Sequence, residues 1–326
     1  MLTHVNKALV NPKKSPRKRS KRMDKLPIKA VLAAIFCGVL FGSAFPAIKL
    51  GYAYFSITND VFSKILYAGI RFFISGIFVY IITFCRQKKA PTLQKNNIVN
   101  VILLALTYTF LLYTFFYLGL SNTTGSIGSI VSSSSVFIAI VLAHFVYPDD
   151  KLNAKKILGC IVGFGGVLIA CLGDSGFTAF SFTGEGFILL ASAFYVVGSV
   201  FSKKAANIDG SFTATAFNLL IGGTLLIIIG LIGKNGEMQI TWQGVLVLAY
   251  LVLVSSLGFT LWSSLLSKYP IGKLSVYNFI IPVSGTFLSA IVLGENLFQW
   301  QYLVALLLVS VGIVIVNLTI KNKSKK

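Results

Sequence analysis

The sequence predicts an all-α integral membrane protein with ten transmembrane helices arranged as two inverted five-helix repeats. Three observations support this class: the composition, the lengths of the apolar runs, and the distribution of basic residues between those runs. Of the 326 residues, 56% are hydrophobic and 12% are charged, whereas a soluble domain carries about 25% charged residues. A run of about 20 apolar residues is long enough to cross a bilayer as a helix, and such runs recur along the whole chain.

Apolar runs define the expected spans, of which the fifth and sixth are short and need flanking residues to cross a bilayer. In chain order the runs are residues 30–50, 65–84, 98–118, 127–147, 157–172, 186–201, 212–232, 245–266, 274–293 and 302–320.

Basic residues are distributed unevenly between the two sides of these spans. If the N-terminus is cytoplasmic, the segments on that side hold 25 of the 29 Lys and Arg residues, and the opposite segments hold only Lys49, Lys64 and Lys234. The remaining basic residue, Arg71, falls inside the second span. Because basic segments mark the cytoplasmic side of a membrane protein, we expect a multi-pass protein of the cell membrane with both termini in the cytoplasm.

The first 29 residues form a basic tail with ten Lys or Arg residues and no apolar period. Such a segment is expected to be disordered and to contact anionic lipid headgroups rather than nucleic acid. Translation from Met1 and from Met23, which opens "MDKLPIKAVLAAIF", both remain open. The expected division of the chain is the tail at 1–29, repeats at 30–173 and 185–320, and a basic C-terminus at 321–326.

An internal repeat relates the two halves. Residues 146–169 align with residues 292–315 at an offset of 146, and at nearly the same offset Arg71 falls opposite Asn218. Each half holds five spans, so the second half enters the membrane with the opposite orientation. Inverted repeats recur among secondary transporters, whose substrate sites lie near the midplane between the halves.

Three segments resemble the EamA family of the drug/metabolite transporter superfamily. They are "VLFGSAFPAIKLG" (39–51), "AGIRFFISG" (68–76) and "VLGENLFQWQYLVALLLVSVGIVIVN" (292–317), and the resemblance extends over residues 30–320. It departs from the family pattern at Phe41, where Trp is usual, and at Asp149 and Asp150, where Glu is usual. The resemblance implies a membrane transporter, but it does not select a substrate because members of the family carry different metabolites.

Helix breakers and polar side chains at mid-span indicate where a substrate pathway would lie. Proline removes a backbone hydrogen bond within each of two spans, and four consecutive serines, residues 132–135, occupy the centre of the fourth. Single buried hydroxyls usually bond their own helix, but four in succession cover every side of it. The residues assigned to the substrate pathway are Pro46, Arg71, Tyr113, Ser132, Ser134, Trp262, Asn278 and Pro282.

The sequence is compatible with three roles for Arg71. A charged residue within a span costs about 3 kcal/mol on insertion scales, but a long side chain can extend to the outer headgroups and anchor the helix. The guanidinium can instead face a vestibule between the halves and bind a substrate carboxylate. A third role is a closing contact with Glu185 or Glu295.

Two further features have expected structural roles. Gly159 and Gly163 have the spacing that permits close helix contact, in packing or in a homodimer. Asp149 and Glu295 lie at the ends of spans, where they are expected to pair with basic residues or to cap the following helix.

Several activities lack their usual motifs. The four cysteines form no C-x-x-C pair, there is no phosphate-binding loop, and no carboxylate falls deep in a span. We therefore expect no catalysis, cofactor or metal. The expected function is non-ATP export of a small neutral or zwitterionic metabolite such as an amino acid, with membrane lipids as surroundings. A lipid flippase or scramblase is the alternative and an intramembrane enzyme the third; substrate, direction, coupling ion and oligomeric state remain open.

Overall fold

The computed structural model describes residues 26–57, 60–146, 152–171, 180–234, 236–269, 274–296 and 299–321. The expected disordered tail, Asp149 and Asp150 therefore lie almost entirely outside the described residues, as does most of the basic C-terminus. Within the described residues the chain is all-helical and forms ten membrane-spanning helical segments in two five-helix repeats, as predicted. Seven of these segments are individually long and apolar enough to cross a membrane.

The first repeat contains five spans, two of which are built from more than one helix. They are α1 (Ile28–Tyr54), α2 (Val61–Gln87), the third span η1 (Lys95–Asn97), α3 (Ile98–Leu104), η2 (Ala105–Leu111) and α4 (Leu112–Ser121), the fourth span α5 (Gly125–Ser132) and α6 (Ser134–Val146), and α7 (Ala154–Ala170).

The second repeat follows the same order of spans. It consists of the sixth span η4 (Phe182–Gly186) and α8 (Phe187–Asp209), then α9 (Ser211–Gly233), α10 (Trp242–Lys268), the ninth span η5 (Ser275–Phe279) and α12 (Ile280–Leu293), and α13 (Trp300–Lys321).

The helices differ from the apolar runs in length and continuity. The sixth span is 28 residues long, not short, because polar residues on both sides of the apolar run continue the helix. The fourth span is interrupted at Ser133, and the ninth begins as a 3-10 turn. The third span contains a π-helical stretch, η2. A hydropathy pattern reports which residues prefer lipid, but it does not report these local changes in backbone hydrogen bonding.

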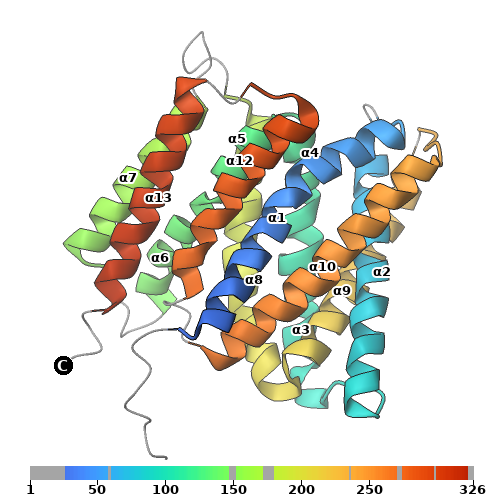
Figure 1. Ribbon diagram of the computed structural model, residues 1–326. Helices are drawn as coiled ribbons and strands as arrows, with labels where there is room; N and C mark the ends of the chain where they lie inside the picture. The colour runs from blue at the N-terminus through green and yellow to red at the C-terminus, as the bar shows by residue number, and fades with distance from the viewer. Residues whose placement is uncertain are drawn as a thin grey trace, which may run out of the picture.

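Packing between the repeats is symmetric. Helix α2 packs most extensively on α9, its counterpart, and α7 packs on α13, its counterpart. Helix α1 contacts α10 and α12, while the equivalent α8 contacts the corresponding helices of the first repeat. Figure 1 shows α7 and α13 side by side at one edge of the bundle and α2 and α9 at the opposite edge, with α1 crossing between them.

A pair of equivalent hydrogen bonds supports this relation at the level of single residues. The Nε of Arg71 on α2 donates to the Oγ of Ser255 on α10 over 2.9 Å. The Oγ1 of Thr109 on η2 donates to the Oδ1 of Asn218 on α9, also over 2.9 Å. Ser255 follows Thr109 by the 146-residue offset, so both bonds join the second span of one repeat to the third span of the other.

Close helix packing accounts for the glycines of α7. A Cβ on Gly312 of α13 would lie 2.7 Å from the Gly159 carbonyl oxygen and 2.7 Å from the Cα of Gly163. Small residues let two helices approach closely in a membrane. The small-residue spacing on α7 is therefore used within the chain against α13.

Glu295 caps a helix, although not the one that follows it in the chain. Its carboxylate accepts hydrogen bonds from the backbone N–H groups of Gly125 at 2.7 Å and Ser126 at 2.9 Å, at the start of α5. Carboxylates are favourable at helix N-termini, where N–H groups lack helical partners. The expectation that Glu295 caps the following helix is wrong, since its partner belongs to the other repeat.

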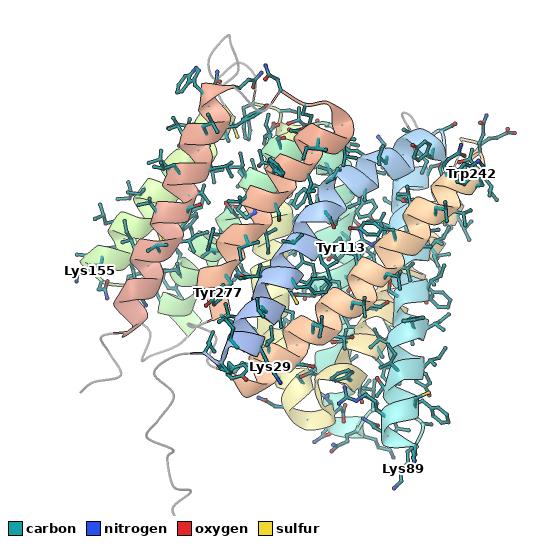
Figure 2. All side chains as sticks on the ribbon, viewed as in Figure 1. Lys29, Lys89, Tyr113, Lys155, Trp242 and Tyr277 are labelled. Carbon is teal, nitrogen blue, oxygen red and sulfur yellow. The ribbon has the colours of Figure 1, made fainter. Side chains whose placement is uncertain are left out.

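Basic and apolar side chains are distributed as a membrane requires. Lys29, Lys89 and Lys155 lie toward one end of the bundle and Trp242 lies at the other (Figure 2). Large apolar side chains are exposed on the outside of the bundle, including Ile232 (78%) and Ile161 (63%). Such continuous apolar exposure is unfavourable in water and matches contact with lipid.

Candidate functional site

A cavity of about 170 Å³ lies inside the bundle and is bordered by helices of both repeats. A buried water needs about 10–15 Å³ of such space, so the cavity holds on the order of ten waters or one small organic molecule. Tyr113 on α4, one of the lining residues, lies about midway between the ends of the bundle (Figure 2). The cavity is therefore placed where secondary transporters bind their substrates.

The wall of the cavity is largely aromatic with a small number of polar groups. This combination is typical of small-molecule sites, in which apolar surfaces enclose the ligand and a few polar groups orient it. The aromatic lining residues are Phe41, Phe45, Tyr108, Tyr113, Phe116, Tyr195, Phe259 and Trp262. The polar lining residues are Arg71, Ser132, Ser133, Ser135, Ser192, Ser255 and Asn278.

Arg71 is the charged residue of this lining, and it is held rigidly. Its side chain is 3% exposed, with Nε donating to Ser255 and Nη1 donating to the Oη of Tyr117, each over 2.9 Å. The guanidinium carbon also lies 5.0 Å from the centre of the Phe72 ring, a distance at which a cation is attracted to a ring face. The guanidinium is thus directed into the bundle, which is inconsistent with the anchoring role at the headgroups.

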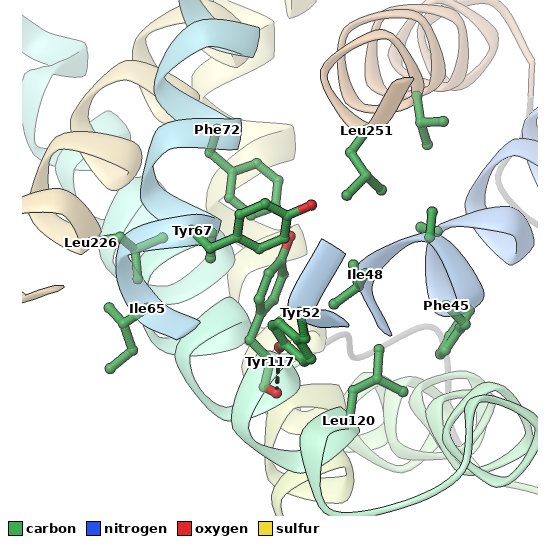
Figure 3. Close-up of a cluster of buried hydrophobic side chains, with 14 of the residues drawn as sticks. Phe45, Ile48, Tyr52, Ile65, Tyr67, Phe72, Tyr117, Leu120, Leu226 and Leu251 are labelled. Atoms are coloured by element: carbon green, nitrogen blue, oxygen red, sulfur yellow. Dashed lines mark hydrogen bonds between the residues drawn. The ribbon is translucent and has the colours of Figure 1, made fainter. Parts of the chain in front are cut away.

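Three buried tyrosines pack against one another beside Arg71. Tyr52, Tyr67 and Tyr117 are all buried, and their ring centres lie 6.1–6.2 Å from one another. The Oη of Tyr52 donates to the Tyr117 backbone carbonyl over 2.8 Å, the bond drawn in Figure 3. Tyr117 therefore links the three tyrosines to the guanidinium, since its own hydroxyl accepts a hydrogen bond from Arg71.

The helix interruptions in the two repeats occur at equivalent positions beside the cavity. The fourth span is interrupted at Ser133, and the ninth changes from a 3-10 turn to α-helix after Phe279, at the 146-residue offset. In the fourth span the hydroxyls of Ser132 and Ser133 donate to the carbonyls three residues earlier. Side-chain hydroxyls that compete for backbone carbonyls bend or interrupt helices, so the serine run explains the interruption.

Asn278 contributes a polar group for which the described part of the chain supplies no partner. Its side-chain amide lines the cavity and makes no hydrogen bond to any residue in the described ranges. Asn278 is half-buried, and polar groups taken out of bulk water are usually hydrogen-bonded to protein or to ordered water. A ligand or water in the cavity is therefore the available partner.

The structure brings together most of the residues that the sequence assigned to a pathway. Arg71, Tyr113, Ser132, Trp262, Asn278 and Pro282 line the cavity, whereas Pro46 and Ser134 do not. Pro46 is buried within a continuous α1, because the helix tolerates one missing hydrogen bond. The Ser134 hydroxyl is fully buried and has no partner among the described residues.

Sequence reasoning did not find several lining residues. Ser255 was missed: it follows Thr109 by the repeat offset, but Thr109 does not line the cavity, so the repeat alone does not single it out. Tyr108, Tyr195 and Ser192 lie in spans without a proline or a serine run, so no local feature distinguishes them from packing residues.

The described carboxylates are occupied elsewhere, so the third role for Arg71 is not seen. Glu295 caps α5, and Glu185 accepts from the Ser181 backbone N–H over 2.8 Å and from the Thr123 hydroxyl. Among the described residues, no group of three or more His, Cys, Asp or Glu is arranged to hold a metal ion.

The EamA-like transporter family matches this chain twice, over residues 28–172 and 182–318. The chain belongs to this family, and with it to the drug/metabolite transporter superfamily. It is a multi-pass membrane transporter.

Individual relatives agree with this class. The chain is 27% identical over 314 residues to the uncharacterized transporter YvbV of Bacillus subtilis, covering 93% of this chain and 96% of that protein. It is 26% identical over 293 residues to a probable amino-acid metabolite efflux pump of Escherichia coli, covering 85% and 91%.

A solved crystal structure has the same fold. It superposes with a TM-score of 0.68 at 16% identity, covering 92% of this chain and all of the solved one. At this identity the match concerns the arrangement of the helices and not the function.

Proposed function

We propose that this transporter exports a small neutral or zwitterionic metabolite, such as an amino acid, by alternating access and without ATP. The observation that carries the proposal is the cavity between the repeats, with helix interruptions at equivalent positions on its wall. Interrupted helices at the midplane are the usual substrate sites of inverted-repeat transporters. The efflux-pump name of the Escherichia coli relative supports export and an amino-acid substrate.

The same cavity favours a transporter over the two other classes considered from the sequence. A lipid flippase needs a polar groove that faces lipid, whereas these polar residues line a cavity bordered by both repeats. An intramembrane enzyme needs a nucleophile or an acid–base pair at depth. Among the described residues, none that lines the cavity is a His, Cys, Asp or Glu.

Efflux measurements test the proposal. Cells that overproduce the protein are loaded with dipeptides, which release free amino acids inside, and the amino acids that appear in the medium are quantified. We expect faster efflux of at least one amino acid than from cells carrying an empty vector. Equal efflux of every amino acid from the two strains would refute amino-acid export.

We further propose that both termini are cytoplasmic and that the protein resides in the cell membrane. The end of the bundle that carries Lys29, Lys89 and Lys155 would then face the cytoplasm, since basic residues mark that side. A reporter that fluoresces only in the cytoplasm, fused after Lys326, is expected to be bright. A dark fusion, together with activity of a reporter that works only outside the cytoplasm, would reverse the assigned orientation.

A further inference from the structure

The charge of Arg71 has no anionic partner among the described residues. The side chain is 3% exposed, and the two groups that accept its hydrogen bonds, Ser255 and Tyr117, are neutral hydroxyls. A buried charge is costly unless it is paired and hydrogen-bonded. The described residues that line the cavity include no Asp or Glu, so a molecule that enters the cavity is a suitable source of the complementary negative charge.

The geometry of the guanidinium leaves a binding surface available. An arginine has five N–H donors in a planar fork that matches the two oxygens of a carboxylate. Here Nε and Nη1 hold the fork in place, while Nη2 donates to none of the described residues. The fork is already immobilised by Ser255, Tyr117 and the Phe72 ring. Anion binding therefore incurs little entropic cost from ordering the guanidinium.

We propose that Arg71 binds the carboxylate of the substrate, and that the cavity selects carboxylate-bearing molecules over analogues in which that group is neutral. The proposal deepens the proposed function and rests on it, since it names the chemical class carried by the same cavity. The aromatic wall encloses the remainder of the molecule. The unpartnered Asn278 amide and the serine hydroxyls are suited to hydrogen-bond an amino group or another polar group of the substrate.

A structural role for Arg71 makes a different prediction. In a purely structural role, Arg71 would connect α2 to α4 and α10 through its hydrogen bonds to Tyr117 and Ser255. Its replacement would then lower stability without changing which ligands bind. Asn218 supplies the matched control, because it occupies the equivalent place in the other repeat. It is 4% exposed, bonds Thr109 across the repeats and does not line the cavity.

The test measures the thermal stability of the purified protein in detergent with matched probes. The probes are L-serine, L-leucine and L-phenylalanine, each compared with its amide, and chloride is titrated separately. We expect at least one amino acid to stabilise the wild-type protein at a concentration roughly 10- to 100-fold lower than its amide, the range for one hydrogen bond to a charged group. Equal stabilisation by acid and amide, equal stabilisation by chloride, or no stabilisation by any of the acids overturns the proposal.

Variants separate recognition from packing. Arg71→Gln is expected to abolish the preference for acid over amide, and Arg71→Lys to weaken acid binding because lysine lacks the planar fork. Tyr117→Phe removes one positioning hydrogen bond and is expected to weaken acid binding while leaving amide binding unchanged. Asn218→Leu should keep the wild-type preference even if the melting temperature falls.

The outcomes also separate this proposal from export itself. Selective binding of an acid in a protein that produces no efflux would refute export and leave carboxylate recognition intact. If the protein exports an amino acid, and the amide of that amino acid inhibits this efflux as strongly as a competing acid at the same concentration, the result would support export and refute the role of Arg71. If Arg71→Gln does not fold, the wild-type comparison of acid and amide and the Tyr117→Phe variant still decide the question.

Discussion

Replacing Ser132 and Asn278 together by leucine is expected to abolish transport while the protein remains inserted and folded. Both side chains line the cavity, and they occupy equivalent positions in the two repeats. Excess volume in a packed site costs about 1–3 kcal/mol, and each 1.4 kcal/mol is roughly tenfold in affinity. The two leucines also remove the Asn278 amide, which no described residue partners. Efflux from cells with equal amounts of variant and wild-type protein in the membrane provides the measurement.

Thr224→Leu is the control for this double variant. The Thr224 hydroxyl donates to the Leu220 carbonyl of its own helix over 2.8 Å, much as Ser132 donates to the carbonyl of Ser129. Thr224 is exposed and does not line the cavity. The control is therefore expected to transport at the wild-type rate. Normal efflux from the double variant would place the substrate pathway elsewhere in the bundle.

The second large effect is expected at the crossing of α7 and α13, where Gly166→Val should destabilise the protein strongly. A Cβ on Gly166 would lie 2.9 Å from the carbonyl oxygen of Ala305, the Cβ of Leu308 and the backbone nitrogen of Val309. Two of these are backbone atoms of α13, so relief requires the helices to move apart. Overpacking of this kind costs about 1–3 kcal/mol, occasionally more, and should lower the melting temperature by several degrees.

The adjacent glycine provides the comparison. A Cβ on Gly165 meets no atom within 4 Å, so Gly165→Val introduces the same residue type into the same helix without a clash. We expect its melting temperature in detergent to remain near that of the wild type. Equal melting temperatures for the two variants would show that the crossing of α7 and α13 is not as close as described.

The symmetry of the fold could be predicted from the sequence because the two repeats retain equivalent polar residues. The pairing of Arg71 with Asn218 was visible at nearly the repeat offset, and the structure shows each of them bonded across to the other repeat. The partners of these bonds were not visible. They depend on which faces of α10 and η2 turn inward, and hydropathy along an entirely apolar helix does not report its rotation.

The candidate site was partly predictable for the same reason. Ser132 and Asn278 stood out because a serine run and a nearby proline mark interrupted helices, and they line the cavity. Tyr108 and Tyr195 lie on its wall without such a signal, and Ser134 lies in the signalled run but is packed away from the cavity. Neighbouring residues on a helix point in different directions, so membership of a run does not decide which of them faces a cavity.

By itself, the sequence determined the membrane class, the ten spans and the repeat, because each depends on the preference of individual residues for lipid or water and on their spacing along the chain. Tertiary structure decided what Arg71 contacts, which helix Glu295 caps, and which polar groups border the cavity. These outcomes depend on the rotation and crossing of helices far apart in the chain. Helix rotation and crossing are set by close packing. The glycine spacing of α7 indicated a close contact, but only the tertiary structure decided that its partner is α13, where Gly312 meets Gly159.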